Sequence, residues 1–277
     1  MPVVATNTAA NSALRFLNNN SSQAAASVGK LASGSRIVKA SDDAAGLAIG
    51  TRLMADVTSL TQAGINASQG ASVVQVADGG LGRIGDVLQR MKALAAQSLS
   101  GVPTDTERGF IDAEFQQLVS EITDIADTTR FNGQSLLDGG AATADYFVGT
   151  DVADTIGVDF QDLANSATAF DAAGLTITGN VASATGASAS MSAIDRAIDL
   201  VSEARATAGA LISRFEFRGQ QIATSLENID AAKSAIMDVD LAAEQSKLVS
   251  NQVLVQAAVS AVSQANQIPQ SLLRVLQ

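Results

Sequence analysis

Apolar and small side chains dominate the last thirty residues of the chain, where no charged residue stands between Lys247 and Arg274. The segment 253–262 reads V-L-V-Q-A-A-V-S-A-V and contains only two polar residues. A helix that is apolar or small on nearly every face is buried all round, whereas chain ends are usually exposed and frayed. The pattern therefore predicts a terminal helix that another surface covers.

A second uncharged run, residues 16–29, lies near the opposite end of the chain. Its apolar and small positions follow alternating spacings of three and four, the period of one helix face: Leu14, Leu17, Ser21, Ala24, Val28 and Leu31. We expect the two ends to pair as helices, and copies of the protein to bury the pair together. The apolar residues expected in this assembly packing are Leu14, Leu17, Val28, Leu31, Leu248, Val255, Val259, Val262, Leu272 and Leu273.

One long helical pattern fills residues 41–99. Ser41 is a good N-cap, and Asp42 and Asp43 would stand in the first turn, where the helix dipole favours anions. A seam of alternating four- and three-residue spacings follows, the signature of helices packed side by side, with glycines at 79, 80 and 82 between its two halves. If this helix is continuous, about 58 residues form a rod of roughly 87 Å.

A capping box, Thr104-Asp105-Thr106-Glu107, predicts a further helix after a break at Gly101-Val102-Pro103. Its apolar seam continues to Ile125, and Asn132-Gly133 then supplies the turn signal that ends it.

The central region has a different pattern. Short apolar runs at 145–149, 155–160 and 174–178 lie between turn residues and predict strands, so we expect a β region at about residues 140–180. Aspartates are frequent here, but their spacing does not match an EF-hand loop, and solvated turn residues are favoured over a calcium site. Small residues at 183–190 predict a linker.

A heptad pattern from Met191 to Ile236 predicts another long helix, and Asp238-Val239-Asp240 separates it from the terminal helix. The expected fold class is mainly α: a long antiparallel helical hairpin or coiled-coil bundle formed by the N- and C-terminal halves, with a small central β-hairpin region. Packing between the long helices is expected to use Leu53, Val57, Leu60, Ile111, Leu118, Ile122, Ile222, Leu226 and Ile229.

Composition narrows the chemistry. The chain has no Cys and no His, which excludes disulfides, thiolate nucleophiles and His-based acid–base catalysis. Asp42 and Asp43 are adjacent at a helix start and cannot face each other across a cleft. We therefore expect no enzyme activity and no bound cofactor or metal.

A net charge of -11 disfavours a nucleic-acid surface. Polar residues interrupt the uncharged C-terminal run and disfavour a membrane span, and the N-terminus lacks the pattern of a secretory signal.

Five segments carry a specific resemblance. They read Leu31-Ala-Ser-Gly-Ser-Arg-Ile37, Ser41-Asp-Asp-Ala-Ala-Gly-Leu-Ala-Ile49, Leu88-Gln-Arg-Met-Lys-Ala-Leu-Ala-Ala-Gln-Ser98, Phe131-Asn132-Gly133 and Gln264-Ala-Asn-Gln-Ile-Pro-Gln-Ser-Leu-Leu273. Together they are similar to bacterial flagellin, and they lie in both halves of the chain in the order found in that family. Only residues 140–190 or so are not distinctive.

The resemblance implies a structural subunit that polymerises into the flagellar filament for swimming motility. It implies an inner-core domain of residues 1–40 plus 241–277, whose terminal helices drive assembly, and an outer-core domain of residues 41–240. Since only about fifty residues separate the helical halves, the chain resembles a minimal flagellin without outer variable domains.

The family's partners and location follow as expectations. They are other copies in a helical homopolymer, the flagellar export apparatus, an export chaperone, and the filament cap and junction proteins, with the product outside the cell in the filament. A vertebrate innate immune receptor is a further partner in the family, and Arg90, Leu94 and Glu114 match its contact positions. Ala93 and Ala96 replace an acidic and a larger apolar residue of the recognised pattern, so we expect weak activation.

Two alternatives share part of this pattern. A hook–filament junction protein has the same general plan, and a secreted coiled-coil adhesin would share the helical hairpin but not the two terminal motifs. The closing segment Q-A-N-Q-I-P-Q at residues 264–270 resembles flagellin itself.

Overall fold

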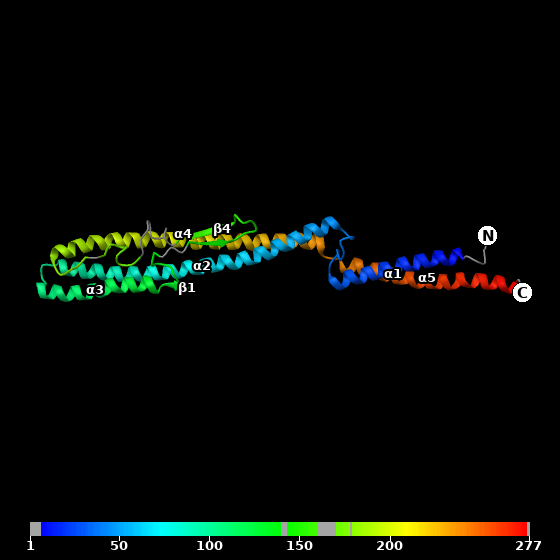
Figure 1. The fold of residues 1–277 in the computed structure, drawn as a ribbon, viewed down its shortest axis with the longest axis horizontal. Helices are drawn as coiled ribbons and strands as arrows, with labels where there is room; N and C mark the ends of the chain where they lie inside the picture. Colours follow the sequence, from blue (N-terminus) through cyan, green and yellow to red (C-terminus); the bar gives the residue numbers. More distant parts are fainter. Residues whose placement is uncertain (1–6, 140–142, 160–169, 178, 276–277) are drawn as a thin grey trace. The chain divides into compact units, whose positions relative to one another are not determined.

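The computed structural model describes residues 7–139, 143–159, 170–177 and 179–275, with side chains as far as residue 267. Its helices are α1 (Thr8–Ser33), α2 (Ala44–Leu99), α3 (Asp105–Thr128), α4 (Ala184–Met237) and α5 (Leu241–Val275) (Figure 1). Its strands are β1 (Arg130–Phe131), β2 (Gln134–Ser135), β3 (Thr143–Phe147) and β4 (Thr155–Asp159). The expected mainly α fold with a small β region is confirmed.

Two compact units make up the chain. The terminal unit contains residues 1–57 and 228–277, and the bundle unit contains residues 58–227. Both boundaries fall inside the long helices α2 and α4. The division at residues 40 and 241 expected from the resemblance stays a prediction.

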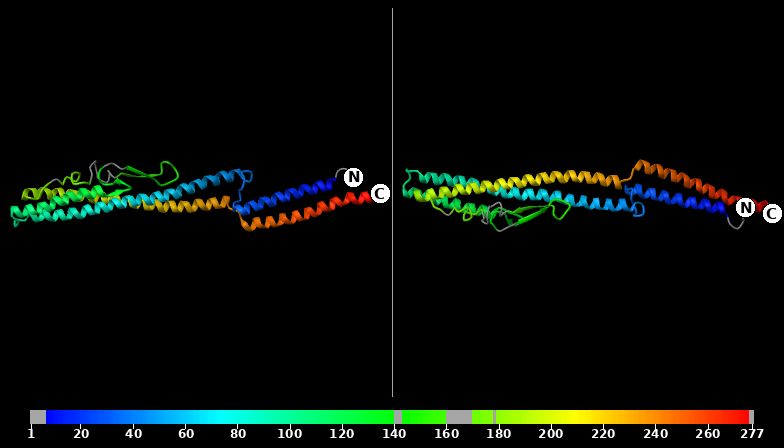
Figure 2. Two further views of the ribbon diagram at one scale, coloured as in Figure 1. Left: turned by 60° about the horizontal axis from the view of Figure 1, so that its bottom comes forward. Right: turned by 90° about the horizontal axis from the view of Figure 1, so that it is seen from above.

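In the bundle unit, α2 runs antiparallel to both α3 and α4 (Figure 2). Arg90 of α2 is ion-paired with Glu114 of α3, and Lys92 of α2 is ion-paired with Asp195 of α4. The core between these helices includes buried apolar side chains of all three: Leu81, Ile84, Leu88 and Met91 of α2, Phe115 and Ile122 of α3, and Ile194, Val201, Phe215 and Ile222 of α4. Each helix contributes one stripe with helical period to this core.

The predicted N-cap of α2 is wrong by two residues. Ser41 does not cap the helix; Asp43 does, because its Oδ1 accepts the N–H of Gly46 at 2.8 Å. Asp42 lies before the helix, where Oδ2 accepts the N–H groups of Val38 at 3.1 Å and Lys39 at 3.0 Å. These bonds, the one from Lys39 foremost, hold the pKa of Asp42 below its usual value. Asp caps as well as Ser does, so the sequence alone did not choose between adjacent candidates.

The continuity of α2 is confirmed, since its 56 residues run through all three glycines of the 79–82 segment. Gly80 has a packing reason to be glycine. A Cβ there would lie 2.6 Å from Oγ1 of Thr129 and 2.8 Å from Cδ1 of Leu137. The glycine therefore lets the end of α3 and the segment after β2 approach the α2 backbone.

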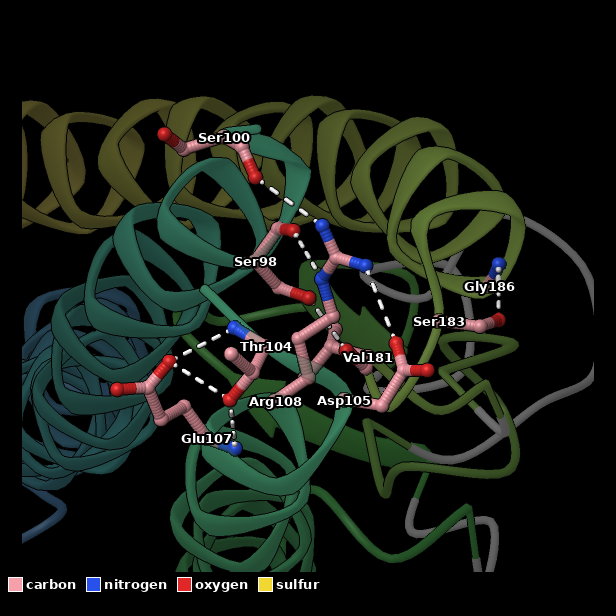
Figure 3. Close-up of polar contacts among 9 residues, drawn as sticks. All are labelled: Ser98, Ser100, Thr104, Asp105, Glu107, Arg108, Val181, Ser183 and Gly186. Carbon is pink, nitrogen blue, oxygen red and sulfur yellow. Dashed lines mark hydrogen bonds and ion pairs between the residues drawn. The ribbon is translucent and has the colours of Figure 1, made fainter. Parts of the chain in front are cut away.

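The α2–α3 turn is fixed by a polar cluster at the predicted break (Figure 3). The capping box is confirmed: Thr104 accepts the N–H of Glu107, and the Glu107 carboxylate accepts the N–H of Thr104 at 2.7 Å. The N–H of Thr104, and after it the Thr104 hydroxyl, which donates to Oε2 of Glu107 at 2.8 Å, hold the pKa of Glu107 below its usual value. Arg108 of α3 donates Nε to the carbonyl of Ser98 at 3.0 Å and Nη2 to that of Ser100 at 3.1 Å. A side chain of α3 thus satisfies carbonyls at the end of α2, whose own last turn has no basic residue.

Two antiparallel hairpins follow α3. β1 and β2 are joined through Asn132 and Gly133, which have φ values of 50° and 81°, so the predicted Asn-Gly turn is confirmed. β3 pairs with β4 in a register that places Tyr146 opposite Ile156. This hairpin packs on α2 and α4, because Nδ2 of Asn66 donates to the carbonyl of Phe147 at 3.0 Å and the rings of Tyr146 and Phe215 meet edge to face.

The third predicted strand, residues 174–178, is wrong over the part that the structure describes; Thr178 lies outside the described residues. Asp171 Oδ1 accepts the N–H of Gly174 at 2.6 Å, and Thr176 has a φ of 58°, so the segment forms turns. Its apolar side chains Leu175 and Ile177 are nevertheless buried. The alternation of apolar and polar residues therefore predicted correctly which side chains are buried. It did not predict the backbone conformation, because a turn that begins at an aspartate replaces the strand.

The predicted linker at residues 183–190 is also wrong, because α4 begins at Ala184. Ser183 accepts the N–H of Gly186 at 3.1 Å, as an N-cap does. Ala187 and Ser190 are buried, and Ser190 Oγ donates to the carbonyl of Asn180 at 3.1 Å. Small residues serve here as close helix contacts rather than as a flexible connection.

Gly70 provides a test of the bundle packing. A Cβ at this position would lie 2.6 Å from two ring atoms of Phe215, whose side chain is buried and cannot move aside. Gly70→Ala is expected to lower the free energy of unfolding by about 1–3 kcal/mol through overpacking. Gly79→Ala, in the same helix but facing open space, should raise it by about 0.5–1 kcal/mol. Urea unfolding followed by circular dichroism measures both, and equal stabilities would contradict the close contact.

Candidate assembly surface

The terminal unit is built on the pairing of α1 with α5, which lie side by side (Figures 1 and 2). Oδ1 of Asn7 accepts the N–H of Ala10 and so caps α1, while Gly34 ends that helix with a φ of 69°. Asp240 caps α5 by accepting the N–H groups of Ala242 and Ala243 at 3.0 Å. The predicted break before the terminal helix is confirmed.

A backbone clasp joins the segments that follow α1 and precede α5. The N–H of Arg36 donates to the carbonyl of Met237 at 2.6 Å, and the N–H of Val239 donates to that of Gly34 at 3.1 Å. The Ser35 hydroxyl also donates to the Met237 carbonyl at 3.1 Å. The two helices therefore leave this clasp side by side and run antiparallel.

Each helix turns one stripe toward the other, and the stripes alternate spacings of three and four residues. On α1, the buried and half-buried positions of the stripe are Ala10, Ala13, Leu17, Asn20, Ala24, Ser27 and Leu31. On α5, they are Glu244, Leu248, Asn251, Val255, Ala258, Val262 and Ala265. The expected pairing of the two ends of the chain is confirmed, although its seam is smaller and more polar than the apolar residues alone suggested.

The predicted assembly residues divide between this seam and its flanks. Leu17, Leu31, Leu248, Val255 and Val262 lie in the seam. Leu14, Val28 and Val259 are exposed in the single chain, and the side chains of Leu272 and Leu273 lie outside the described residues. Leu14, Ser21 and Val28 form a seven-residue repeat beside the seam, which pattern counting merged with the seam itself.

A set of large apolar side chains on the two helices is left uncovered by the pairing. This uncovered apolar set comprises Leu14, Phe16 and Val28 of α1 and Leu241, Val249, Val253, Leu254 and Val259 of α5. Phe16 is 65% exposed and Val253 is 63% exposed. Val249 and Val253 are four residues apart, on the face of α5 turned away from the stripe. No charged residue stands between Lys247 and Arg274, so few charges resist burial of that face.

Phe16, Val249 and Val253 were not among the predicted assembly residues. Sequence reasoning assigned the most regular stripe to packing, and these three lie off it. These residues are identified by their position outside the contact stripe. The sequence does not show which face of each helix the other helix covers, so this position could not be predicted.

The residues predicted for packing between the long helices are all withdrawn from solvent to some degree. Leu60, Ile122 and Ile222 are buried, and Ile111, Leu118 and Leu226 are half-buried in the bundle unit. Leu53, Val57 and Ile229 are half-buried in the terminal unit. The half-buried residues among them keep some apolar surface exposed, which a contact with another molecule could cover.

The three residues matched to receptor contacts lie together on α2 and α3. Nε of Arg90 donates to Oε1 of Glu114 at 2.9 Å, so the two side chains are paired with each other. Leu94 is 2% exposed and belongs to the bundle core.

Within the described ranges, no three His, Cys, Asp or Glu side chains are grouped as a metal site would need. The central aspartates that are described there include turn residues: Oδ2 of Asp154 accepts the N–H groups of Thr150 and Asp151 at 3.2 Å. Arg218 is ion-paired with Asp154, and these contacts lower the pKa of that carboxyl, the bond from Asp151 foremost. None of the helices, over their described residues, is both long and apolar enough to cross a membrane.

Comparison with known proteins agrees with this architecture. Residues 4–142 match the bacterial flagellin N-terminal helical region, and residues 191–276 match the bacterial flagellin C-terminal helical region. The flagellin of Halalkalibacterium halodurans is 39% identical over 272 residues, which covers 98% of each chain. The flagellar filament 33 kDa core protein of Treponema phagedenis is 36% identical over 274 residues, covering 95% of this chain and 96% of that protein.

A crystal structure of Bacillus cereus flagellin has a TM-score of 0.50 and 27% identity, covering 61% of this chain and 94% of that one. The two matched regions leave only residues 143–190 between them, as a minimal form without an outer variable domain requires. The resemblance seen in the sequence motifs is confirmed, and the chain belongs to the bacterial flagellin family.

Proposed function

We propose that this chain is a structural subunit of a bacterial flagellar filament and that α1 and α5 carry its assembly surface. The single observation that supports the location of this surface is the uncovered apolar set on the paired terminal helices. A monomeric soluble protein rarely leaves so many large apolar side chains exposed on one pair of helices.

The energetics favour a polymer over an isolated pair of copies. Burying the eight side chains of the uncovered apolar set would contribute on the order of 10 kcal/mol per subunit. Association costs roughly 4–15 kcal/mol in lost translational and rotational freedom. The two quantities are comparable, so one contact that covers part of the set is too weak. Contacts with several neighbours at once are needed, and heterologous contacts that do not close into a ring provide them in an open helical assembly.

We assign residues 1–40 with 241–277 to an inner core and residues 41–240 to an outer core, as the family resemblance implies. The support for the first assignment is the two uncharged runs, residues 16–29 of α1 and 248–273 of α5, which suit burial among neighbouring copies. The support for the second is the half-burial of Ile111, Leu118 and Leu226 in the single chain.

The proposed location is outside the cell, in the filament, after export through the flagellum's own channel. The partners proposed on the same resemblance are the export apparatus, an export chaperone, and the filament cap and junction proteins. A hook–filament junction role and a secreted adhesin role are not better supported, because the two relatives described above are named as a flagellin and a filament core protein.

Assembly through α5 can be tested with one substitution and one truncation. Val253→Asp places a carboxylate on the uncovered face of α5 without entering the α1 seam, so the chain should stay folded and helical while filament formation falls at least tenfold. Removal of residues 248–277 should also leave a soluble, helical protein that forms no filaments. Electron microscopy after salting-out, with circular dichroism, measures both properties.

Val152→Asp is the matched control, since Val152 is 89% exposed in the turn between β3 and β4 of the bundle unit. It should assemble like the unmodified chain. Filaments from the truncated chain, or from Val253→Asp at normal yield, would contradict the proposed surface.

Recognition by the innate immune receptor is expected to be weak. Arg90, Leu94 and Glu114 match the contact positions of the family, but Ala93 and Ala96 replace an acidic and a larger apolar residue of the recognised pattern. In a reporter-cell assay, monomer of the natural sequence should be far less potent than a double variant, Ala93→Asp with Ala96→Leu, that restores the family's pattern at those two positions. Full potency of the natural monomer would contradict this expectation.

A further inference from the structure

Glu244 is the one charged residue, among those that the structure describes, that is buried. It is 6% exposed and lies in the α1–α5 seam, where its Oε1 accepts the hydroxyl of Ser27 at 2.7 Å. Its Oε2 meets Nζ of Lys247, on the same helix, at 3.2 Å. Ser27 is also buried, at 4% exposed. The only hydrogen bond from α1 to this carboxylate therefore comes from one buried hydroxyl.

The register of the seam follows from two contacts. Ser27 meets Glu244 near one end, and Nδ2 of Asn7 donates to the carbonyl of Ala265 at 2.8 Å near the other. Between these contacts the two helices run antiparallel, and their seam positions follow every three or four residues. Each seam position of α1 therefore lies opposite one seam position of α5, and we call such a pair a level. The resulting levels are Ala24 with Leu248, Asn20 with Asn251, Leu17 with Val255, and Ala13 with Ala258.

Most of these levels do not distinguish one register from another. Three of the four join only alanine, leucine and valine, which can pack in more than one register. The fourth joins Asn20 with Asn251; both are half-buried, so a shift costs less there than at a buried carboxylate. The backbone clasp at Gly34 and Met237 does not select a register by side chain, since it consists of main-chain bonds and of the Ser35 hydroxyl, which bonds only main-chain carbonyls. Glu244 is different. A shift by one level would face it with Ala24 or Leu31 and leave a buried carboxylate without its donor.

Glu244 also distinguishes between helices as partners. The α5 stripe itself contains no serine or threonine, so a contact between α5 helices of two copies through this stripe would give Glu244 no hydroxyl donor. Only α1 presents Ser27 at the matching level. A buried polar contact of this kind costs stability but selects one pairing, as a polar residue does in a coiled-coil seam.

We propose that Ser27 and Glu244 form a polar pin that selects α1 as the partner of α5 and fixes their register. The pin acts within one chain, so it does not depend on filament formation. Ser27 and Glu244 are positioning residues. They determine which helix pairs with α5 and in which register, rather than how stable each helix is.

The chain contains no cysteine, so engineered cysteine pairs can report the register directly. Ala13→Cys with Ala258→Cys joins positions at one level, whereas Ala13→Cys with Val255→Cys or Val262→Cys reports a shift by one level. Oxidation of the full chain followed by non-reducing electrophoresis separates intrachain cross-links from interchain ones. In the natural background, the in-register pair should cross-link at least tenfold more efficiently than either shifted pair.

Glu244→Leu should remove most of this preference, by about tenfold, with gains in shifted or interchain products, although the seam becomes more apolar and need not lose helicity. Glu244→Gln should retain the preference, because its amide oxygen still accepts the Ser27 hydroxyl. Ser27→Ala, which leaves the carboxylate without its donor, should act like Glu244→Leu.

Unchanged cross-linking in Glu244→Leu and Ser27→Ala would overturn the pin, as would failure of the in-register pair to cross-link in the natural background. The intrachain band is read without reference to filaments, so failure of the pin and failure of the proposed assembly surface are distinguishable.

The stability that Glu244 contributes to the α1–α5 pair should also respond to acid. The Ser27 hydroxyl, followed by Lys247 and Lys30, lowers the pKa of Glu244 below its ordinary value of about 4.5, against the opposing effect of burial. Lys30 is the charged group that α1 contributes near the carboxylate, and Lys247 is the one on α5. A lowered pKa means that the stabilisation is complete above about 4.5 and is lost as pH falls through the lower, folded-state value.

The thermal midpoint of the natural chain should therefore exceed that of Glu244→Gln near neutral pH, and the difference should disappear at pH values well below 4.5. The other carboxylates titrate in both the natural chain and Glu244→Gln, so their effect on the thermal midpoint is removed when the two midpoints are subtracted. A difference that stays constant across this range would contradict the stabilisation of the α1–α5 pair by the charge on Glu244.

Discussion

Incomplete burial in the α1–α5 pair is the constraint on which the rest of the molecule depends. Two helices packed side by side can cover only one stripe of each, so a helix that is apolar beyond that stripe stays exposed. The bundle unit meets this limit by adding a third helix and two hairpins, which enclose residues such as Leu88 and Phe115 completely. In the described part of the terminal unit, α1 and α5 pack mainly on each other, and we propose that another molecule supplies the remaining cover.

The choice of residues in the terminal seam fits this division. Alanine and serine in the seam allow α1 and α5 to approach closely, but they bury little apolar surface area. The larger residues Phe16 and Val253 lie outside the seam and stay exposed. A seam of small residues also has low selectivity for one pairing. One buried hydrogen bond to a carboxylate therefore has more influence on the pairing there than it would have in a core of large, interlocking side chains.

Much of the fold was predictable because helical periodicity extends over dozens of residues. The long helix through Gly80 and the capping box at Thr104 are examples. The errors arose where local chemistry offered adjacent choices. Ser41 and Asp43 are equivalent caps by type, and Asp171 converts a strand-like run into turns. For the assembly surface, periodicity identified the helices but not which face α1 covers, so Leu14 was grouped with the seam although it lies beside it.

The short connection between α4 and α5, residues 238–240, has a consequence for how such a chain can vary in length. Because each helical residue advances the side-chain direction by about 100°, one residue added within the first turn of α5 would change the rotational phase of the rest of that helix. The side chains beyond the insertion would then turn away from α1. Insertions should therefore be excluded from the first turn of α5, which sets the rotational phase of every later residue in that helix, and tolerated between the two helical halves.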